Sequence, residues 1–561
     1  MKKPGVLICF ILLASASLLD AASGKTYPLS SPVYRLMDSL YALTGSGTPS
    51  NSRPWSYDEA RMILGRAEAS AHTEEEQLIV QKIKAILDED LNINGGASLN
   101  LEAYAHTNTD FGSESDWIIG YEQRKPLLEA FVEFSFLDTV YSYCDIRIAK
   151  GKFSMDDTRL AVFQGSGVWP EWGIGTLITE LPQESDELKI RVIEDSVFYS
   201  SAFSSNILTK ASDFDSAFPK RALFSAGGTG WFASIGRDRL DWGNSSIGNL
   251  VIDDHVDFHD HLRLEFFSDK FKYEFLTLFL ESDLSCRQTE DESTRFFISH
   301  RLEYRPFGSL TLSISEGVMY RTDGIIELKY FNPSFILHNL DNHSIFNAIA
   351  HLEADWQVAK GLNLYTQFAL DQATAPGEGR DQSPSFGLVL GAEYTSASPS
   401  GIFSTSLEGV YTSPLVYRRD EVDFLVISRN KVSGTGGYVV DIDFLGFPYG
   451  NDSIVFQSES RFDFFSGASI GFTAREIVKG TLDIYASHNS GNDNTALPNL
   501  GGTTPYGDTA YFATILDLNG SYEFSSHISA EAQMSFINRW DTSSRSSSND
   551  FQIAVSLSYS I

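Results

Sequence analysis

Cysteine and long apolar stretches are both scarce in this chain. Only three of its 561 residues are cysteines, too few for a disulfide scaffold in a chain of this length. No stretch reaches about 18 consecutive apolar residues, which excludes membrane-spanning helices. If the chain crosses a membrane, it must therefore cross with strands.

Positive charge is the third scarcity. The chain has 42 Lys and Arg against 74 Asp and Glu, for a formal net charge of -32. Binding to nucleic-acid phosphates needs clustered Lys and Arg, so a nucleic-acid partner is excluded. A Gly-rich phosphate loop with Lys and Ser or Thr is also missing. The acidic excess suits a solvated surface, or a lumen and loops that meet cations or neutral sugars.

The first residues are typical of a secretory signal. Lys2 and Lys3 supply the positive start, and residues 6–13 form a short apolar core. Ala21 and Ser23 then stand where a signal peptidase cuts before the next glycine. The sequence thus predicts a signal peptide over residues 1–23 and an exported mature chain.

The cysteines leave two readings open. Cys9 lies inside the apolar core of the signal and not after it, which argues against a lipoprotein. After cleavage only Cys144 and Cys286 remain, in an oxidising compartment. They either form one bridge or stay as two thiols, and the sequence does not decide between these.

Residues 30–95 have the pattern of a small helical bundle. Gly45 ends a first run of apolar residues at helical spacing. Ser56 with Glu59, and Thr73 with Glu76, have the spacing of capping boxes at the start of two further helices. The bundle is expected in the periplasm.

From about Ala97 onward the period changes from 3.6 to 2. Apolar and often aromatic residues alternate with polar or small ones, as in the runs 140–148, 271–275, 310–315, 386–394 and 553–561. A soluble β-sandwich would turn the apolar face inward, whereas a membrane barrel turns it to lipid. Export, the number of such segments without domain punctuation, and a final amphipathic strand that ends at Ile561 favour the barrel.

The fold class predicted is therefore an all-β, antiparallel transmembrane barrel over residues 97–561, preceded by the helical bundle. At roughly 25 to 30 residues per strand with its connection, this length gives about 16–18 strands. A barrel of that size has an aqueous interior unless something plugs it. The predicted location is the outer membrane, with the lipid bilayer and the barrel assembly machinery as partners.

Several segments resemble, in order, the capsule assembly Wzi family. The opening helices are similar over residues 33–36 and 53–60. Further matches follow at residues 235–237, 241–243, 248–250, 330–333, 341–342, 365–367, 370–371 and 446–452. Each motif alone is weak, but their ordered occurrence covers nearly the whole mature chain.

The resemblance implies an 18-stranded outer-membrane barrel with a periplasmic helical bundle. It also implies a surface lectin that holds capsular polysaccharide. No short motif marks the sugar-binding residues, so the resemblance assigns none of them here and the ligand-binding residues stay unknown.

A run of His and Asp residues invites a metal-site hypothesis. If this segment is a strand, Asp253, His255, Asp257, His259 and His261 project to one side and offer imidazole and carboxylate ligands. Partners two residues apart on a flat strand seldom converge on one ion. The favoured interpretation is lumen-facing polar positions, with no metal and no cofactor.

Catalytic pairs are poorly placed. His343 beside Ser344, and Ser299 beside His300, bring a nucleophile and a base together in sequence. Adjacent strand residues point to opposite faces, so neither pair predicts a hydrolase and no enzyme is expected. Four tryptophans could stack on sugars but are better interpreted as membrane-interface girdle residues: Trp169, Trp172, Trp231 and Trp242.

Three functions fit these observations. The first is binding or assembly of a surface or capsular polysaccharide. The second is a diffusion porin whose acidic lumen favours cations, and the third is a structural or adhesive surface protein. The sequence does not say whether the lumen is open or plugged, which glycan or solute is involved, or how the chain oligomerises.

Overall fold

The computed structural model describes residues 23–88, 93–108, 124–136, 138–150, 160–165, 176–178, 188–193, 202–209, 214–215, 219–280, 294–322, 328–334, 337, 345–372, 385–419, 422–431, 438–482 and 509–561. The predicted signal peptide lies outside this part except for its last residue. So do Cys286, His343, Ser344, Trp169 and Trp172.

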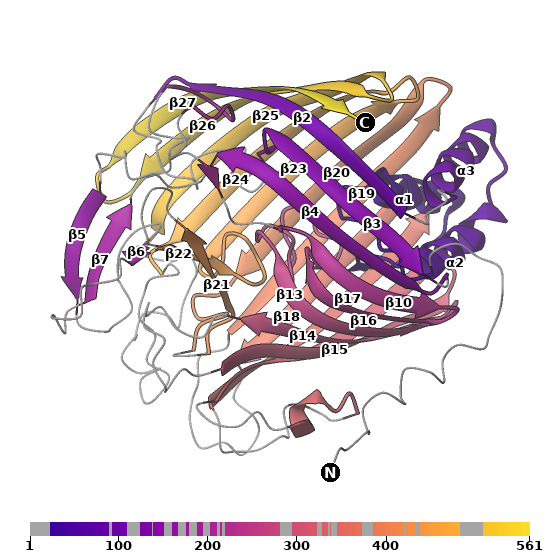
Figure 1. Ribbon diagram of the computed structural model, residues 1–561, viewed down its shortest axis with the longest axis horizontal. Coiled ribbons are helices and arrows are strands. Elements are labelled where there is room, and N and C mark those ends of the chain that lie inside the picture. Colours follow the sequence, from indigo (N-terminus) through magenta and orange to yellow (C-terminus); the bar gives the residue numbers. More distant parts are fainter. Residues whose placement is uncertain are drawn as a thin grey trace, which may run out of the picture.

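A closed antiparallel barrel makes up most of the described chain (Figure 1). Eighteen described strands pair in sequence around the wall, and the last, β27, pairs with the first, β2. This confirms the predicted fold class. The wall consists of β2 (Ile93–His106), β3 (Leu128–Phe136), β4 (Val140–Lys150), β10 (Ala222–Gly228), β11 (Trp231–Asp238), β13 (His259–Phe267), β14 (Phe271–Leu280), β15 (Thr294–Phe307), β16 (Leu310–Thr322), β17 (Ile345–Ala359), β18 (Leu362–Gln372), β19 (Ser385–Ser398), β20 (Gly401–Thr412), β23 (Ser453–Phe464), β24 (Ala468–Gly480), β25 (Thr509–Ser525), β26 (Ile528–Asp541) and β27 (Ser546–Ser560).

The remaining strands are short or lie outside the wall. The strands β8 (Phe203–Ser205) and β9 (Phe214–Asp215) extend the edges of β2 and β4. A separate small sheet is formed by β5 (Leu160–Gly165), β6 (Thr176–Ile178), β7 (Leu188–Ile193), β21 (Leu425–Lys431) and β22 (Tyr438–Phe444).

Alternation sorts the wall residues onto two faces. On β16, for example, Leu312 and Ile314 point outward and are exposed, whereas Thr311, Ser313 and Ser315 point inward and are buried. Large apolar side chains are exposed in the same way around the outer wall, from Leu101 on β2 to Leu557 on β27. Exposed apolar residues on this scale form the belt that a transmembrane barrel presents to lipid.

The two mouths of the barrel differ in their connections. At one mouth neighbouring strands are joined by turns of a few residues, such as 308–309 and 526–527, and at the other by connections of up to 71 residues, the longest being 151–221. Outer-membrane barrels place short turns in the periplasm and long loops outside. The short-turn mouth is thus the periplasmic one.

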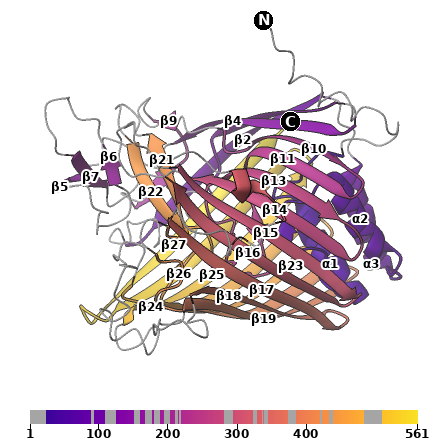
Figure 2. The same cartoon turned by 90° about the horizontal axis from the view of Figure 1, so that it is seen from below.

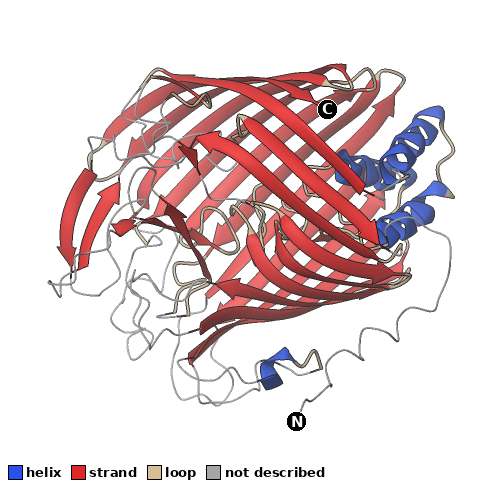
Figure 3. Ribbon diagram, viewed as in Figure 1, coloured by secondary structure: helices blue, strands red, loops and turns tan. Residues whose placement is uncertain are grey.

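Three helices stand beside the short-turn mouth (Figure 3): α1 (Pro32–Thr44), α2 (Tyr57–Glu68) and α3 (Glu74–Leu87). Gly45, with a φ of 76°, caps the C-terminus of α1 in the left-handed region that glycine favours. Thr73 and Glu76 form the predicted capping box of α3. The three helices share a buried core, which contains Val33, Met37, Leu40, Trp55, Ile63, Ile79 and Ile83.

The capping box predicted for α2 forms only in part. Ser56 accepts a hydrogen bond from the Glu59 backbone N–H, as expected. The Glu59 carboxylate, however, accepts from Lys272 Nζ on β14, at 2.8 and 3.0 Å, because that buried ammonium needs an anionic partner. Burial is also the main cause that raises the pKa of Glu59 to about 7. Glu59 therefore joins the helices to the barrel wall.

Backbone bonds hold the helices against the turns. Gly361 N–H donates to Ala42 O at 2.8 Å and Gly47 N–H donates to Gly308 O at 2.7 Å. None of the described helices has the length and apolarity needed to cross a bilayer. Cys144 forms no disulfide within the described residues and lies on the outward face of β4.

Closure of the barrel depends on the last residues of the chain. Tyr559 pairs with Leu99, and Ile561 exchanges two backbone hydrogen bonds with Ala97, at 2.9 and 3.1 Å. We predict that deletion of residues 559–561 strongly lowers the amount of heat-modifiable barrel in the outer membrane. The deletion removes the periplasmic end of the seam, where residues 97–99 pair with residues 559–561, and leaves the start of β2 unpaired on that side.

A matched control for this deletion is Tyr559→Phe, which keeps the seam and the outward ring. Tyr559→Asp puts a charge on the lipid side, near the interface, and is expected to cost less than about 2 kcal/mol there. Normal folded levels of the truncated chain, measured by band shift in unheated gels, would contradict the role of the seam.

Candidate functional site

The lumen is occupied by the chain itself. The connection between β11 and β13, residues 239–258, turns inward and meets two further segments, one described over residues 413–419 and 422–425 and the other over residues 444–452. Together these three segments form what we call the plug. Its apolar side chains pack on inward-facing wall residues in one core that includes Leu240, Trp242, Leu250, Ile252, Phe297, Met319, Val389, Val416, Phe424, Leu445 and Phe447.

The plug has a defined local structure because its backbone is paired. The short strand β12 (Asp241–Trp242) pairs with β1 (Ser52–Arg53), a piece of the extended segment that precedes α2. Gly243 continues this contact by donating to Asn51 O at 2.8 Å. Its φ of 138° and the nearness of Asn249 and Gln367 leave no room for a Cβ atom. A glycine is required at this position.

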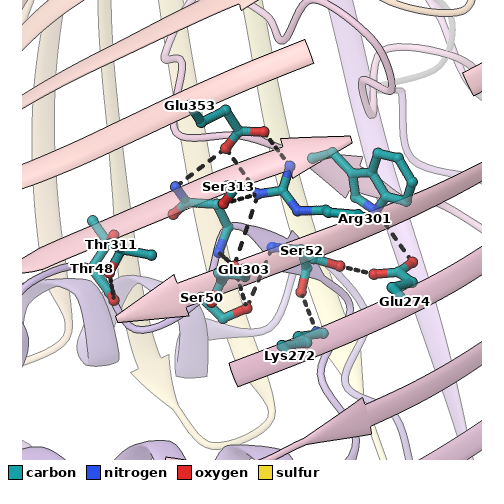
Figure 4. Close-up of polar contacts among 12 residues, drawn as sticks. Thr48, Ser50, Ser52, Lys272, Glu274, Arg301, Glu303, Thr311, Ser313 and Glu353 are labelled. Carbon is teal, nitrogen blue, oxygen red and sulfur yellow. Dashed lines mark hydrogen bonds and ion pairs between the residues drawn. The ribbon is translucent and has the colours of Figure 1, made fainter. Parts of the chain in front are cut away.

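An ionic network anchors the N-terminal segment to the inner wall (Figure 4). Arg301 on β15 forms a two-pronged ion pair with Glu353 on β17, and its Nη2 also bonds Ser313 Oγ at 2.9 Å. Glu303 accepts from Ser50 Oγ and from the Asn51 backbone N–H, both at 3.2 Å. These wall residues are at most 5% exposed. Buried charges of this kind are stable only when they are paired.

A second set of charges continues the network on β13 and β14. Arg263 Nε donates to Glu274 Oε1 at 2.7 Å, and Lys272 Nζ bonds Ser52 O at 3.0 Å. Trp242 of the plug donates its indole N–H to the same Glu274 at 3.2 Å. One carboxylate thus joins the wall and the plug.

Glu408 on β20 holds the plug by several donors at once. Its carboxylate accepts from Ser245 Oγ at 2.6 Å, Ser246 N–H at 2.8 Å, Ile247 N–H at 3.1 Å and Tyr365 Oη at 2.6 Å. Hydrogen bonds to a charged acceptor are among the strong ones in proteins. Glu408 therefore binds the plug to the wall.

We predict that Glu408→Gln loosens the plug without unfolding the barrel. An amide can replace the carboxylate's shape but accepts fewer of these bonds, and each lost bond to a charged group is worth about 1.5–3 kcal/mol. Amide hydrogen exchange of residues 245–248 is expected to accelerate at least tenfold. Exchange in β26 serves as the internal control, and equal exchange at residues 245–248 in both proteins would show that Glu408 holds nothing.

The metal-site hypothesis assumed one strand, and that assumption is wrong. Strand β13 begins only at His259, because Asp238 pairs with His259 and the residues before it leave the wall for the plug. His255 bonds Asp253 at 2.7 Å, and Asp257 pairs with Lys220. His259 accepts from Leu240 N–H at 3.1 Å, and His261 bonds Ser234 Oγ at 3.0 Å. The structure does not bring His255, Asp257, His259 and His261 around one point.

A different acidic group forms in the plug. Within the described residues, Asp241, Asp253 and Asp254 are the one set of three possible metal ligands whose atoms lie within 4.8 Å of one another. Asn249 satisfies part of their hydrogen bonding, by its backbone N–H to Asp253 at 2.6 Å and by its side chain to Asp241 at 2.5 Å. Burial, followed by the nearby Asp254 and Asp253, raises the pKa of Asp241 well above its usual range. A carboxyl with a raised pKa is more readily protonated, which relieves repulsion within the group.

The tryptophan and catalytic-pair interpretations have separate outcomes. Trp231 lies outward at the periplasmic edge of β11, a position that fits the girdle. Trp242 is fully buried in the plug, so the girdle interpretation is wrong for it. Ser299 points inward and donates to Glu316 O at 2.7 Å, whereas His300 points outward and bonds the Glu316 carboxylate at 3.1 Å. The two residues face opposite sides of the wall.

Part of the inner wall remains in contact with water. On β24, β25, β26, β27 and β2, several residues that point into the lumen are partly exposed. They include Thr473, Asn519, Gln533, Ser556 and Ser98. Hydroxyl and amide groups of this kind can bond sugar hydroxyls. Tyr511 and Arg539 lie on the same wall, with the guanidinium 4.2 Å from the ring centroid. The polar half of the lumen thus offers both hydrogen-bonding groups and an aromatic ring.

Comparisons with known proteins bear on the fold. No protein-family model matches the chain, and no curated protein sequence matches it. The solved structure of Wzi from Escherichia coli aligns with 96% of this chain and 99% of its own, with a TM-score of 0.55 and 11% identity. The chain has the Wzi fold. That protein is described as an outer-membrane, carbohydrate-binding β-barrel involved in group 1 capsule assembly.

Other solved outer-membrane proteins match less closely. Acinetobacter baumannii OccAB4 has a TM-score of 0.36 at 10% identity and covers 84% of this chain and 98% of its own. Pseudomonas aeruginosa OpdQ has a TM-score of 0.35 at 10% identity, with the same coverage. The Wzi fold and the exposed apolar belt confirm the predicted location in the outer membrane.

The sequence did not reveal the plug. Outside the His and Asp run its residues have no strand alternation, and apolar residues such as Leu250 and Ile252 stand among Gly, Asn, Ser and Asp as they would in a surface loop. The wall strands do show charged residues two positions apart, for instance Arg301 with Glu303 and Glu353 with Asp355, and this pattern hints at a polar network on the inner face. Such charges also line water-filled lumens, so the pattern alone does not separate the two cases.

Proposed function

We propose that this Wzi-type barrel holds a surface polysaccharide at the outer membrane and does not act as a diffusion pore. The observation that carries the proposal is the partly filled lumen: the plug and the N-terminal segment occupy one side of the space that a porin leaves to solute. The carbohydrate binding described for Escherichia coli Wzi supports the same assignment. Folding requires the barrel assembly machinery, and the role is not enzymatic.

The negative charge of the chain limits which glycans it can bind. With a net charge of -32, long-range electrostatics disfavour an anionic polymer unless cations bridge it to the protein. Neutral repeats, or acidic repeats in the presence of divalent cations, are the preferred ligands. Weak sites gain strength on a long polymer because tethering raises the effective concentration of each next epitope.

The test is retention of the organism's own surface polymer by the purified barrel, with long and short chains compared. Retention is expected to rise steeply with chain length, and for an acidic polymer to fall when a chelator removes divalent cations. A neutral polymer of the same length is the control for the chelator. Equal, negligible retention of long and short chains, together with large conductance, would favour the porin alternative.

A further inference from the structure

The outer wall of β14–β17 is not uniformly apolar. In its periplasmic half the outward side chains are exposed, for example Leu302 at 40%, Ile314 at 55% and Leu352 at 51%. In its extracellular half the outward side chains Phe275, Ile298 and Tyr320 are between 1% and 2% exposed. Something other than lipid therefore covers these three side chains, although Phe279 near the end of β14 is exposed at 40%.

The cover is a piece of the chain that folds back along the outside. It consists of the short 3₁₀-helix Leu328–Phe331 with residues 332–334 and Leu337, and is called the strap below. Both Figure 1 and Figure 2 show this helix outside the strands. Tyr330 lies 4.2 Å from Tyr320 and Phe331 lies 5.9 Å from Phe296, measured between ring centroids.

A polar pair on the outer wall fixes the lower end of the strap. His300 Nε2 and Glu316 Oε2 are 3.1 Å apart on neighbouring strands, and the same carboxylate oxygen accepts from Leu337 N–H at 3.1 Å. Tyr273 Oη donates to Pro333 O at 2.5 Å. An ionisable pair on the outward face of a barrel is costly in hydrocarbon, so its place here needs a reason.

The height of this pair can be compared with the other side of the same barrel. His300 lies seven residues before Phe307, the periplasmic end of β15. On β26, Met534 and Phe536 lie six and eight residues from the periplasmic end, Ile528, and are exposed apolar residues. At the height where one wall presents apolar side chains to lipid, the other presents a polar pair and a strap.

The exposed edge of the strap is polar. Asn332, Pro333 and Ser334 are exposed, and Lys329 is half-buried above Tyr330. Irregular backbone and polar side chains do not occur against hydrocarbon. Directly beneath this edge, the exposed apolar rows that contain Leu302 and Ile314 begin. The boundary reproduces the junction between the head group and the acyl chains of a lipid.

We propose that the strap seats the phosphate-bearing head group of an outer-leaflet lipid, whose acyl chains lie on the apolar rows beneath it. The Lys329 ammonium, the Ser334 hydroxyl and the Asn332 amide supply the cation and donors that a phosphate needs. The membrane boundary is consequently lower on this wall than on the wall of β25 and β26.

Position is tested by fluorescence quenching of the full chain in vesicles of phosphatidylglycerol and phosphatidylcholine. An environment-sensitive probe is attached at Pro333→Cys, an exposed strap position outside the proposed phosphate ligands, or at the control Met534→Cys, with Cys144 and Cys286 replaced by Ser. Lipid brominated in mid-chain is expected to quench the control at least twofold more than the strap probe, and aqueous iodide to do the reverse. Equal quenching of both probes by brominated lipid, or quenching of the strap probe by neither agent, would overturn the proposal.

Chemistry is tested by the lipids retained by the detergent-purified chain, counted by native mass spectrometry. The unmodified chain is expected to retain phosphatidylglycerol over phosphatidylcholine by about threefold or more, and Lys329→Gln to lose most of that preference. Lys270→Gln, in an exposed periplasmic turn, is the control. An absent preference, or equal loss in both variants, would overturn the phosphate assignment.

Discussion

Replacement of residues 240–257 by a four-residue Gly-Ser turn is expected to make the barrel permeable to small sugars. The ends of β11 and β13 pair directly, Asp238 with His259, so a short turn can join them without distorting the wall. The replacement removes Trp242, Leu250 and Ile252 from the core of the lumen. An 18-stranded barrel without such filling is wide enough for an aqueous channel.

The measurement is the swelling rate of liposomes in a sugar solution, with heat-modifiable migration as the check on folding. At least a fivefold increase over the unmodified protein is expected, since water and solute then enter the space that the core occupied. Trp242→Phe, which keeps the plug segment and an aromatic ring but loses the bond to Glu274, is the matched control and should swell slowly. An unchanged rate in a folded, plug-deleted barrel would mean that the described plug is not what closes the lumen.

Arg301→Met is expected to be the most destabilising single substitution in the wall. It leaves Glu353 buried without the guanidinium that pairs with it, whereas Glu303 keeps its other partner, Arg305, and breaking a buried pair in this way costs about 3–5 kcal/mol. The temperature at which the folded band converts to the unfolded one should fall markedly. Arg301→Lys keeps the charge but not the two-pronged geometry, and an intermediate fall is expected.

The companion variant Glu353→Gln tests whether the effect comes from the pair. Combined with Arg301→Met it removes the charge left uncompensated at residue 353, so the double variant should be more stable than Arg301→Met alone. Additive losses in the double variant would show that the two side chains act separately and would contradict the network drawn in Figure 4.

Periodicity predicted the barrel because strand alternation is a local property. Runs such as 310–315 show both faces of the wall directly in the sequence, and spacing put the strand count at about 16–18, which includes the eighteen observed among the described residues. Capping residues likewise marked α1 and α3, since a cap is fixed by residues three or four apart. Glu59 departed from its expected role because a distant lysine competes for it.

The plug depended on contacts between segments far apart in the sequence. Ser245 donates a hydrogen bond to Glu408, and Gly243 donates one to Asn51. The residues that neighbour Glu408 and Asn51 in the sequence give no indication of these distant partners. The His and Asp run was interpreted as one strand because its polar residues alternate, but the pairing of Asp238 with His259 leaves residues 253–258 in the plug and only His259 and His261 in the wall. Alternation in a short polar run is therefore weak evidence for a strand.

The central claim is that the chain closes its own barrel and holds glycan outside the lumen or in its polar half. The most direct test is the steady conductance of the intact, purified protein in a planar bilayer. We expect insertion without large, stable, ohmic steps, and we expect such steps to appear when residues 240–257 are replaced. Large open-channel steps from the intact protein would contradict the account and favour a diffusion pore.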